Sequence, residues 1–215
     1  MMNSLNKTNG KDNLENKVFR RLGRNTDEFE VFSHAHAERI ATLADELAKL
    51  FSLASKDRQS LRAAALLHDL GEATMARDYI KRPGTLTDEE RLDLARHPII
   101  GEQEVGKSGG DRATQLIVRW HHEWWNGCGY PDALRREQIP LAARILRVAD
   151  SYAAITDARP YRPALCQEEA RQHMADRAGI EFDPRIVKAL LCLGPLPELE
   201  SFAISTAEAT ATADV

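Results

Sequence analysis

Apolar residues recur every three or four positions through most of this 215-residue chain, which is the spacing of one face of an α-helix. The clearest run consists of Ile40, Leu43, Ala44, Leu47 and Leu50. No segment alternates apolar and polar residues long enough to predict a strand. The pattern therefore predicts an all-α fold, in which amphipathic helices bury their apolar faces in a single compact bundle.

Capping residues and prolines divide this pattern into separate helices. A threonine three residues before a glutamate predicts a capping box, and a proline is favoured in the first turn of a helix. The expected segments are a buried helix over 61–70, one beginning at the capping box of Thr87 and Glu90, one from about Pro98 to Gly106, one over 139–156, and a last one beginning at Asp183-Pro184.

Composition separates both ends of the chain from the bundle. Residues 1–16 are rich in Asn, Lys and Gly and predict a flexible lead-in, and residues 205–215 are rich in Ala and Thr and predict a flexible tail. The helical domain is therefore expected over residues 17–204.

Charge, cysteines and hydropathy limit the class of protein. The net charge of −4 argues against a nucleic-acid polymer or an anionic membrane as partner. Three scattered cysteines indicate reduced thiols, and no apolar run reaches the ~18 residues of a membrane helix. The start of the chain shows no secretory signal. We expect a soluble, cytoplasmic protein.

Histidines and aspartates lie beside the apolar segments, where a polar side chain is costly unless something binds it. An aspartate in such surroundings must be paired or bound to a cation. Mixed imidazole and carboxylate ligands suit Fe, Mn or Zn, and the lack of neighbouring cysteine pairs argues against a structural zinc site. The candidate ligands are His36, His68, Asp69, His97, His121, His122 and Asp150. Seven ligands exceed the needs of one ion, so we expect two ions that share a carboxylate.

Each of these residues taken singly is more typical of an ordinary core or surface position. We interpret His34 and His173 in that way, as surface or hydrogen-bonded core histidines. The metal-site interpretation depends on the joint occurrence of a His-Asp pair, a His-His pair, a His-Pro pair and an isolated Asp beside buried segments.

Ordered motifs over residues 36–184 resemble the HD-GYP family, the phosphodiesterases of bacterial cyclic di-GMP signalling. The matching segments are His36-x-x-Arg39, Ala65-Leu66-Leu67-His68-Asp69-Leu70-Gly71, Arg82-Pro83-Gly84-Thr85-Leu86-Thr87, His97-Pro98-x-x-Gly101, His121-His122-Glu123, Gly129-Tyr130-Pro131, Ile139-Pro140-Leu141-Ala142, Val148-Ala149-Asp150-x-Tyr152, Arg159-Pro160-Tyr161-Arg162 and Phe182-Asp183-Pro184.

The resemblance implies a helical bundle of the HD type with a catalytic pair of metal ions. It implies the same seven ligands, with Asp69 as the bridge, and a substrate groove lined by Tyr130, Arg159 and Arg162. Iron or manganese is the expected metal, with Zn, Ni or Mg as alternatives. Some relatives hold a third metal through a glutamate where this chain has Phe32, so two metals are expected. A signalling partner at the Gly-Tyr-Pro loop and a homodimer are left open.

Three residues depart from the family pattern. Glu72 replaces a lysine that resembles a phosphate-facing group, and Ala153 and Ala158 replace aspartates. A carboxylate facing a phosphate at 4 Å would cost about 4 kcal/mol at an effective dielectric constant of ~20. Glu72 either faces the groove, points to solvent, or pairs with an arginine such as Arg77.

The expected reaction is hydrolysis of cyclic di-GMP by a hydroxide bridging the two metals, with Asp69, Glu72 and Arg162 as the catalytic candidates. Arg162 would neutralise charge on the phosphate oxygens. Two alternatives remain: a catalytically weak module that binds a nucleotide or a partner, and a di-iron HD-type oxygenase with a similar order of ligands. A phosphodiesterase assay on wild type and Glu72→Lys separates the three.

Overall fold

The computed structural model describes residues 5–32, 34–158 and 163–194, of which residues 5–15 are described by their backbone alone. This part of the chain is helical, and its sole β-type pairing is an isolated bridge between Ala178 and Phe182. The helices are α1 (Leu5–Phe29), α2 (His36–Leu50), α3 (Ser55–Leu67), α4 (Leu70–Met75), α5 (Asp78–Lys81), α6 (Asp88–Leu94), α7 (His97–Lys107), α8 (Arg112–Arg119), the short 3-10 helix η1 (Arg136–Gln138), α9 (Leu141–Thr156), α10 (Gln167–Asp176) and α11 (Pro184–Cys192). The all-α prediction is confirmed.

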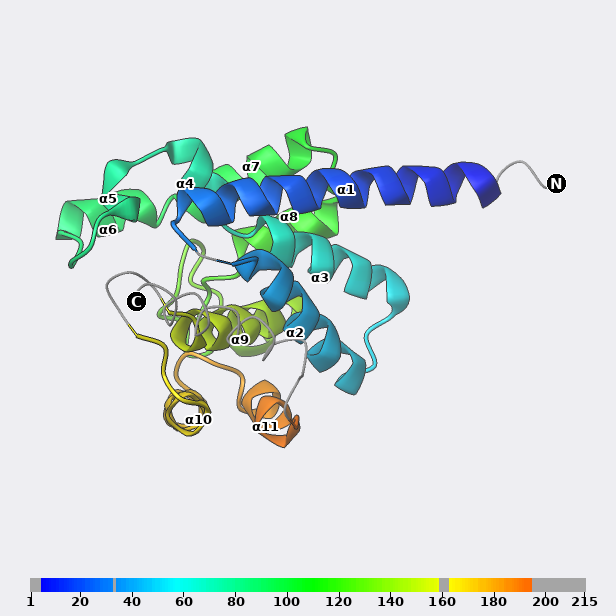
Figure 1. Ribbon diagram of the computed structural model, residues 1–215. Helices are drawn as coiled ribbons and strands as arrows, with labels where there is room; N and C mark the ends of the chain where they lie inside the picture. Colours follow the sequence, from blue (N-terminus) through cyan, green and yellow to red (C-terminus); the bar gives the residue numbers. More distant parts are fainter. Residues whose placement is uncertain (1–4, 33, 159–162, 195–215) are drawn as a thin grey trace, which may run out of the picture.

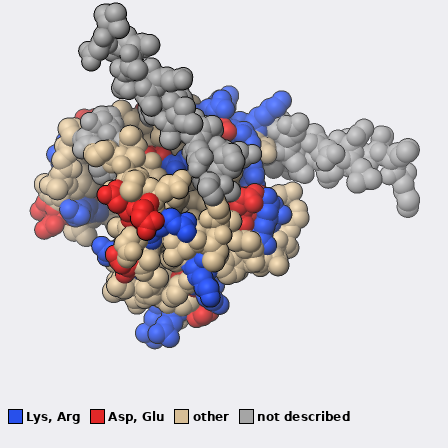
Figure 2. All heavy atoms as spheres, turned by 60° about the horizontal axis from the view of Figure 1, so that its bottom comes forward, with Lys and Arg blue, Asp and Glu red and all other residues tan. Residues whose placement is uncertain are grey.

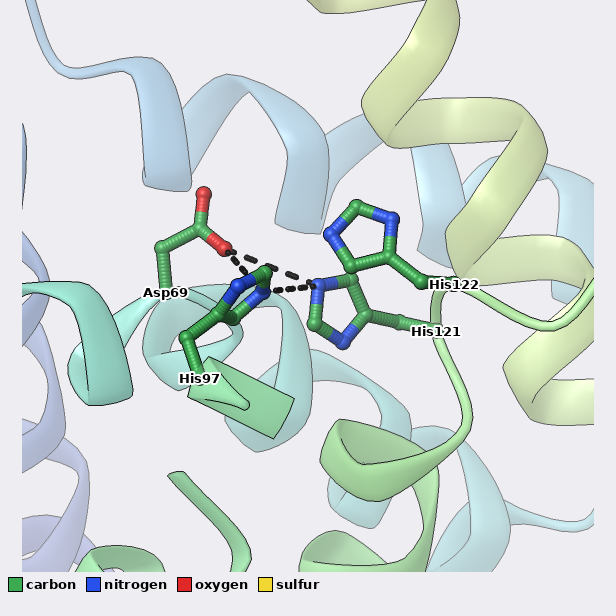
Figure 3. A group of neighbouring side chains, drawn as sticks. All are labelled: Asp69, His97, His121 and His122. Atoms are coloured by element: carbon green, nitrogen blue, oxygen red, sulfur yellow. Dashed lines mark hydrogen bonds and ion pairs between the residues drawn. The ribbon is translucent and has the colours of Figure 1, made fainter. Parts of the chain in front are cut away.

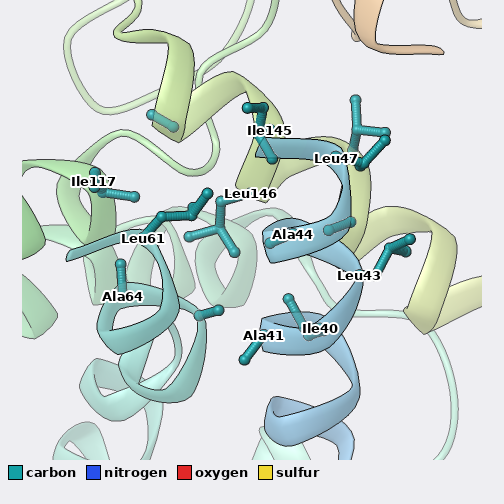
Figure 4. Close-up of a cluster of buried hydrophobic side chains, with 14 of the residues drawn as sticks. Ile40, Ala41, Leu43, Ala44, Leu47, Leu61, Ala64, Ile117, Ile145 and Leu146 are labelled. Carbon is teal, nitrogen blue, oxygen red and sulfur yellow. The ribbon is translucent and has the colours of Figure 1, made fainter. Parts of the chain in front are cut away.

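Helix α2 lies at the centre and contacts α3, α9, α1 and α11 (Figure 1). Its apolar stripe packs against side chains of α3, α8 and α9 in the main core, which Figure 4 shows in close-up. Ile40 and Leu47 are fully buried, so the three-and-four spacing identified the buried face correctly. Leu50 is the exception: it is the last residue of α2 and is 56% exposed, because the helix ends there and the chain turns away.

The predicted helix over 61–70 is two helices in the structure. α3 ends at Leu67, and α4 begins at Leu70, so His68 and Asp69 lie at the break between them. The capping box of Thr87 and Glu90 is present at the start of α6. The proline at the start of α7 and the Asp183 cap of α11 are present as predicted.

Helix α1 begins at Leu5, whereas composition predicted a flexible lead-in through residue 16. Helical hydrogen bonds are local, so a packed segment can propagate a helix into polar sequence. Phe19 anchors the packed half against the core, and Arg20 and Arg24 pair with Glu38 of α2. The N-terminal half extends beyond the other helices in Figure 1. The tail over 205–215 lies outside the described residues, and the domain bounds 17 and 204 stay predictions.

The surface carries both signs of charge. On the face in Figure 2, acidic and basic side chains are interspersed, in keeping with the small net charge of −4. Among the described helices, none is both long and apolar enough to cross a membrane.

Candidate metal centre

Three candidate ligands, His68, His97 and His121, lie just beyond the end of a helix. They follow α3, α6 and α8, and the Nδ1 atom of each ring lies within hydrogen-bond distance of a carbonyl three residues earlier: 3.0 Å from Ala65 O, 2.9 Å from Leu94 O and 2.6 Å from Val118 O. The last carbonyls of a helix have no partner within it and accept readily. Each neutral ring therefore donates from Nδ1 and keeps the lone pair on Nε2 for a metal.

The Nε2 atoms of two of these rings converge on one oxygen of Asp69 (Figure 3). His97 Nε2 lies 3.3 Å from His121 Nε2, and the two atoms lie 3.3 and 3.5 Å from Asp69 Oδ1. Two facing lone pairs repel, and either a proton on one nitrogen or a cation between them removes the repulsion. Ligands about 2.1 Å from one ion are roughly 3.0–3.4 Å apart in octahedral or tetrahedral geometry, so this spacing fits a metal.

The second oxygen of Asp69 faces a second group of ligands. His68 Nε2 lies 3.0 Å from Asp69 Oδ2 and 3.8 Å from Asp150 Oδ1. One ligand atom from each of His36, His68 and Asp150 falls within 4.8 Å of the others, and the same holds for Asp69, His97, His121 and His122. The seven predicted ligands thus form two adjacent groups, with Asp69 between them.

Two polar atoms at this junction make no hydrogen bond within the described part of the chain: His68 Nε2 and Asp69 Oδ1 are both buried without one. Such atoms are costly unless a ligand satisfies them. The donor set of imidazole nitrogens and carboxylate oxygens fits Fe, Mn or Zn. The residues present therefore fit a pair of divalent cations.

The protein environment sets the charge of these groups. Burial opposes ionisation of Asp69, but His68, His121 and His97 hold the pKa of the carboxyl well below its ordinary value. Burial likewise opposes protonation of His68, yet the Asp69 carboxylate raises the pKa of that ring well above 6.5. Burial and the neighbouring His121 and His97 keep the pKa of His122 well below its ordinary value. Asp69 is therefore ionised and His122 neutral at pH 7.

His36 begins α2, where no helix-end carbonyl is within reach, and its Nδ1 lies 2.6 Å from Asp157 Oδ2. The same carboxylate pairs with His34 Nε2 at 3.0 Å and with the Arg39 guanidinium. Both oxygens of Asp27 on α1 accept the backbone N–H of Ala37, which fixes the first turn of α2. Asp157 thus orients the His36 ring.

Asp157 was not predicted as a site residue, although one signal was available. Asp157 is the acidic residue directly before Ala158, the position where the family's aspartate is absent. Phe32, which stands where a third-metal ligand would be, stacks on the His36 ring at a centroid distance of 3.8 Å.

His122 differs from the other candidate ligand histidines. Its Nδ1 accepts a hydrogen bond from Arg147 at 3.0 Å, since an arginine can only donate. A neutral ring then carries its proton on Nε2. Ligation by His122 therefore requires either that Arg147 releases Nδ1 or that Nε2 loses its proton.

A cavity of about 440 Å³ opens beside the two ligand groups, bounded by α4, α5, the segment before α6, and α9. Its volume falls within the ~300–1,000 Å³ of small-molecule sites. Glu72 lines it and is 13% exposed, with Oε1 3.7 Å from His97 Nδ1. Of the three arrangements considered for Glu72, the groove-facing one is observed, and Arg77 pairs with Asp93 instead.

Other residues of interest surround the same cavity. Its lining includes five carboxylates: Glu30, Asp69, Glu72, Asp150 and Glu181. Arg82 and Arg147 also line it, and so does His173, which the sequence suggested was an ordinary surface or core histidine. The surplus of carboxylates repels an anion unless cations bind among them.

Tyr130 packs the Gly-Tyr-Pro loop onto the candidate ligand His122. Its ring stacks on His122 at a centroid distance of 4.9 Å, and Glu123 accepts the backbone N–H of Asp132 to hold the loop. A Cβ on Gly129 would lie 2.2 Å from Trp124 N, so only glycine fits this close approach. The substrate role of Tyr130 stays a prediction. Arg159 and Arg162 lie outside the described residues.

Comparison with known proteins places this site in a family. A family model described as the HD domain matches residues 20–186. The cyclic di-GMP phosphodiesterase response regulator RpfG of Xanthomonas campestris pv. campestris is 37% identical over 180 residues, which cover 82% of this chain and 47% of RpfG. The 3'3'-cGAMP-specific phosphodiesterase 3 of Vibrio cholerae is 31% identical over 169 residues, covering 79% of this chain and 37% of that protein.

A solved structure supports the fold. The crystal structure of the V. cholerae cyclic GMP-AMP phosphodiesterase V-cGAP3 matches with a TM-score of 0.67 at 19% identity, over 86% of this chain and 50% of that one. The chain spans half or less of the length of these relatives. The resemblance found in the motifs is confirmed.

Proposed function

This chain belongs to the HD domain family, and from that premise we propose that it is a metal-dependent phosphodiesterase that opens a cyclic dinucleotide. The observation that carries the proposal is the position of Asp69: one oxygen faces His97 and His121, and the other faces His68. A carboxylate between two ligand groups suits two-metal hydrolysis of a phosphodiester.

The protein's own residues prepare the site in three ways. In their neutral forms, His68, His97 and His121 can present Nε2 lone pairs, because helix-end carbonyls accept from their Nδ1–H groups. Asp157 fixes His36, and the cavity beside Asp150 gives room for the ligand. When bound, two divalent cations would activate water and neutralise charge on the phosphate. Arg162 is proposed to contact the phosphate oxygens, as the sequence motif predicts.

The substrate we propose is cyclic di-GMP, with 3'3'-cGAMP as the alternative, because relatives named for each match the chain. The test is turnover of both dinucleotides by protein purified without oxygen and loaded with Mn²⁺ or Fe²⁺, with the linear dinucleotide and mononucleotides as products. Asp69→Asn should lose at least 10³-fold in kcat, because one residue serves both ligand groups. Equal turnover by this variant refutes the proposal.

A second function is favoured by one observation: Glu72 lies in the cavity near His97. A carboxylate there opposes an anionic ligand, so the alternative is a catalytically weak module that binds a nucleotide or a signalling partner. Glu72→Lys decides between them. Activity that appears only in the lysine variant supports the weak module, and turnover by wild type supports the enzyme.

A further inference from the structure

Among the described residues that line the cavity, the cations with permanent charge are Arg82 and Arg147. They differ in setting. Arg82 is 44% exposed and pairs with Glu90 on the surface, whereas the side chain of Arg147 is 13% exposed on α9, between the ligand Asp150 and Glu181. An arginine this deep among carboxylates and metal ligands is costly to bury and should have a specific partner.

The hydrogen bonds of Arg147 leave part of its guanidinium unused. One terminal nitrogen donates to His122 Nδ1 at 3.0 Å and lies 3.5 Å from Asp150 Oδ2, and the other pairs with Glu181. The Nε–H group is buried and makes no hydrogen bond to any described residue. A buried donor without an acceptor costs free energy, and an oxygen of an anionic ligand in the cavity would satisfy it.

The partners that Arg147 has are ones that metal loading would alter. A cation bound to His122 Nδ1 in one ligand group, or to Asp150 Oδ2 in the other, would compete with the guanidinium for the same nitrogen or oxygen. Binding of metal to the ligand groups would therefore weaken the contacts of His122 and Asp150 with Arg147, while the ion pair with Glu181 keeps Arg147 at the cavity wall. Its planar fork then matches two oxygens of one phosphate.

We propose that Arg147 is the residue that binds the substrate phosphate from α9, on a cavity wall where Glu72 of α4 supplies negative charge. The proposal for Arg147 rests on the proposed function in one respect: that function identifies the bound phosphate as part of a cyclic dinucleotide. Arg147 opposes the repulsion from Glu72, so the carboxylate at residue 72 is compatible with an anionic ligand.

The test measures inorganic phosphate binding to the Mn²⁺-loaded protein by calorimetry, alongside Mn²⁺ affinity and stoichiometry. Arg147→Met should weaken phosphate binding at least tenfold, and Mn²⁺ binding should stay the same or tighten, because a positive charge leaves the ligands. Arg82→Met makes the same charge change on the same cavity and should weaken phosphate binding less than threefold. If Arg147→Met does not fold, Arg147→Lys, which keeps the charge but loses the fork, should weaken it at least threefold.

Three results would overturn the proposal: no phosphate binding by wild type at millimolar concentration, equal losses in the Arg147 and Arg82 variants, or parallel losses of Mn²⁺ and phosphate, which mark a structural role. Failure of the proposed function is a separate result. If wild type hydrolyses neither dinucleotide, but Arg147→Met alone among the variants loses phosphate binding, the phosphate site stands. If wild type turns over substrate while Arg147→Met binds phosphate normally, the enzyme stands and this role for Arg147 does not.

Discussion

Replacing Asp157 by asparagine should weaken both the fold and the metal site, by amounts that the structure sets separately. Asp157 is 3% exposed and pairs with the buried Arg39 guanidinium. Removing one partner of a buried ion pair typically costs about 3–5 kcal/mol, because the other charge stays buried without compensation. Arg39 keeps a hydrogen bond to Thr156 Oγ1 at 2.8 Å, so we expect the lower end, about 3 kcal/mol.

The effect on metal binding follows from His36. Its Nδ1 lies 2.6 Å from Asp157 Oδ2, and an asparagine amide no longer favours the tautomer that leaves Nε2 free. Loss of such an orienting partner typically costs 10–100-fold in metal affinity, or about 1.4–2.7 kcal/mol. Because His36 belongs to the group with His68 and Asp150, only one of two bound metals should weaken.

Two assays and one control test this reasoning. Urea unfolding in chelator measures stability without metal linkage, and Mn²⁺ titration measures each affinity. Asp45→Asn is the matched control: Asp45 is also a buried aspartate, it lies on α2, and it pairs with Arg58 at 2.9 Å far along the helix from His36. The control should lose stability and bind both metals normally. Wild-type metal affinity in Asp157→Asn, or an equal loss in the control, refutes the orienting role.

Three further predictions concern proton uptake, close packing and metal linkage. Burial raises the pKa of Asp27 to about 6 from its ordinary 3.8, so its ionised form costs about 3 kcal/mol and the folded state loses stability as pH rises from about 4 to 7. The free energy of unfolding in urea and chelator, measured for wild type and for Asp27→Asn, should differ by an amount that shows this fall. A difference that does not change with pH contradicts the prediction. A Cβ on Gly71 would lie 2.1 Å from His97 O, so Gly71→Ala should lose about 1–3 kcal/mol of stability and bind less metal. Thermal melting measures the stability, and elemental analysis measures the metal content. Unchanged metal content contradicts the packing argument. Metal at 100 times its dissociation constant should stabilise the fold by about 2.7 kcal/mol and raise the Tm over that in chelator; identical Tm values would show that the ligand groups bind no metal.

Much of the fold and of the candidate site could be predicted from the sequence. The helical period identified the buried face of α2, and the seven candidate ligands fall into two adjacent groups in the structure. What could not be predicted depends on contacts between distant elements. The break at His68, which splits the expected helix, and the cavity position of His173 have no signature in local sequence.

The contrast between His36 and the other ligand histidines shows where such prediction ends. His68, His97 and His121 follow helix ends, and each finds the acceptor for its Nδ1 proton three residues back in its own chain segment. A histidine just after the end of a helix therefore has a local reason to present Nε2 to a metal. The helix before His36, α1, ends at Phe29, too far back for its last carbonyls to accept from the His36 ring, so His36 needs a carboxylate from elsewhere. That carboxylate is Asp157, 121 residues away, and only the packing of α2 against α9 brings it into place.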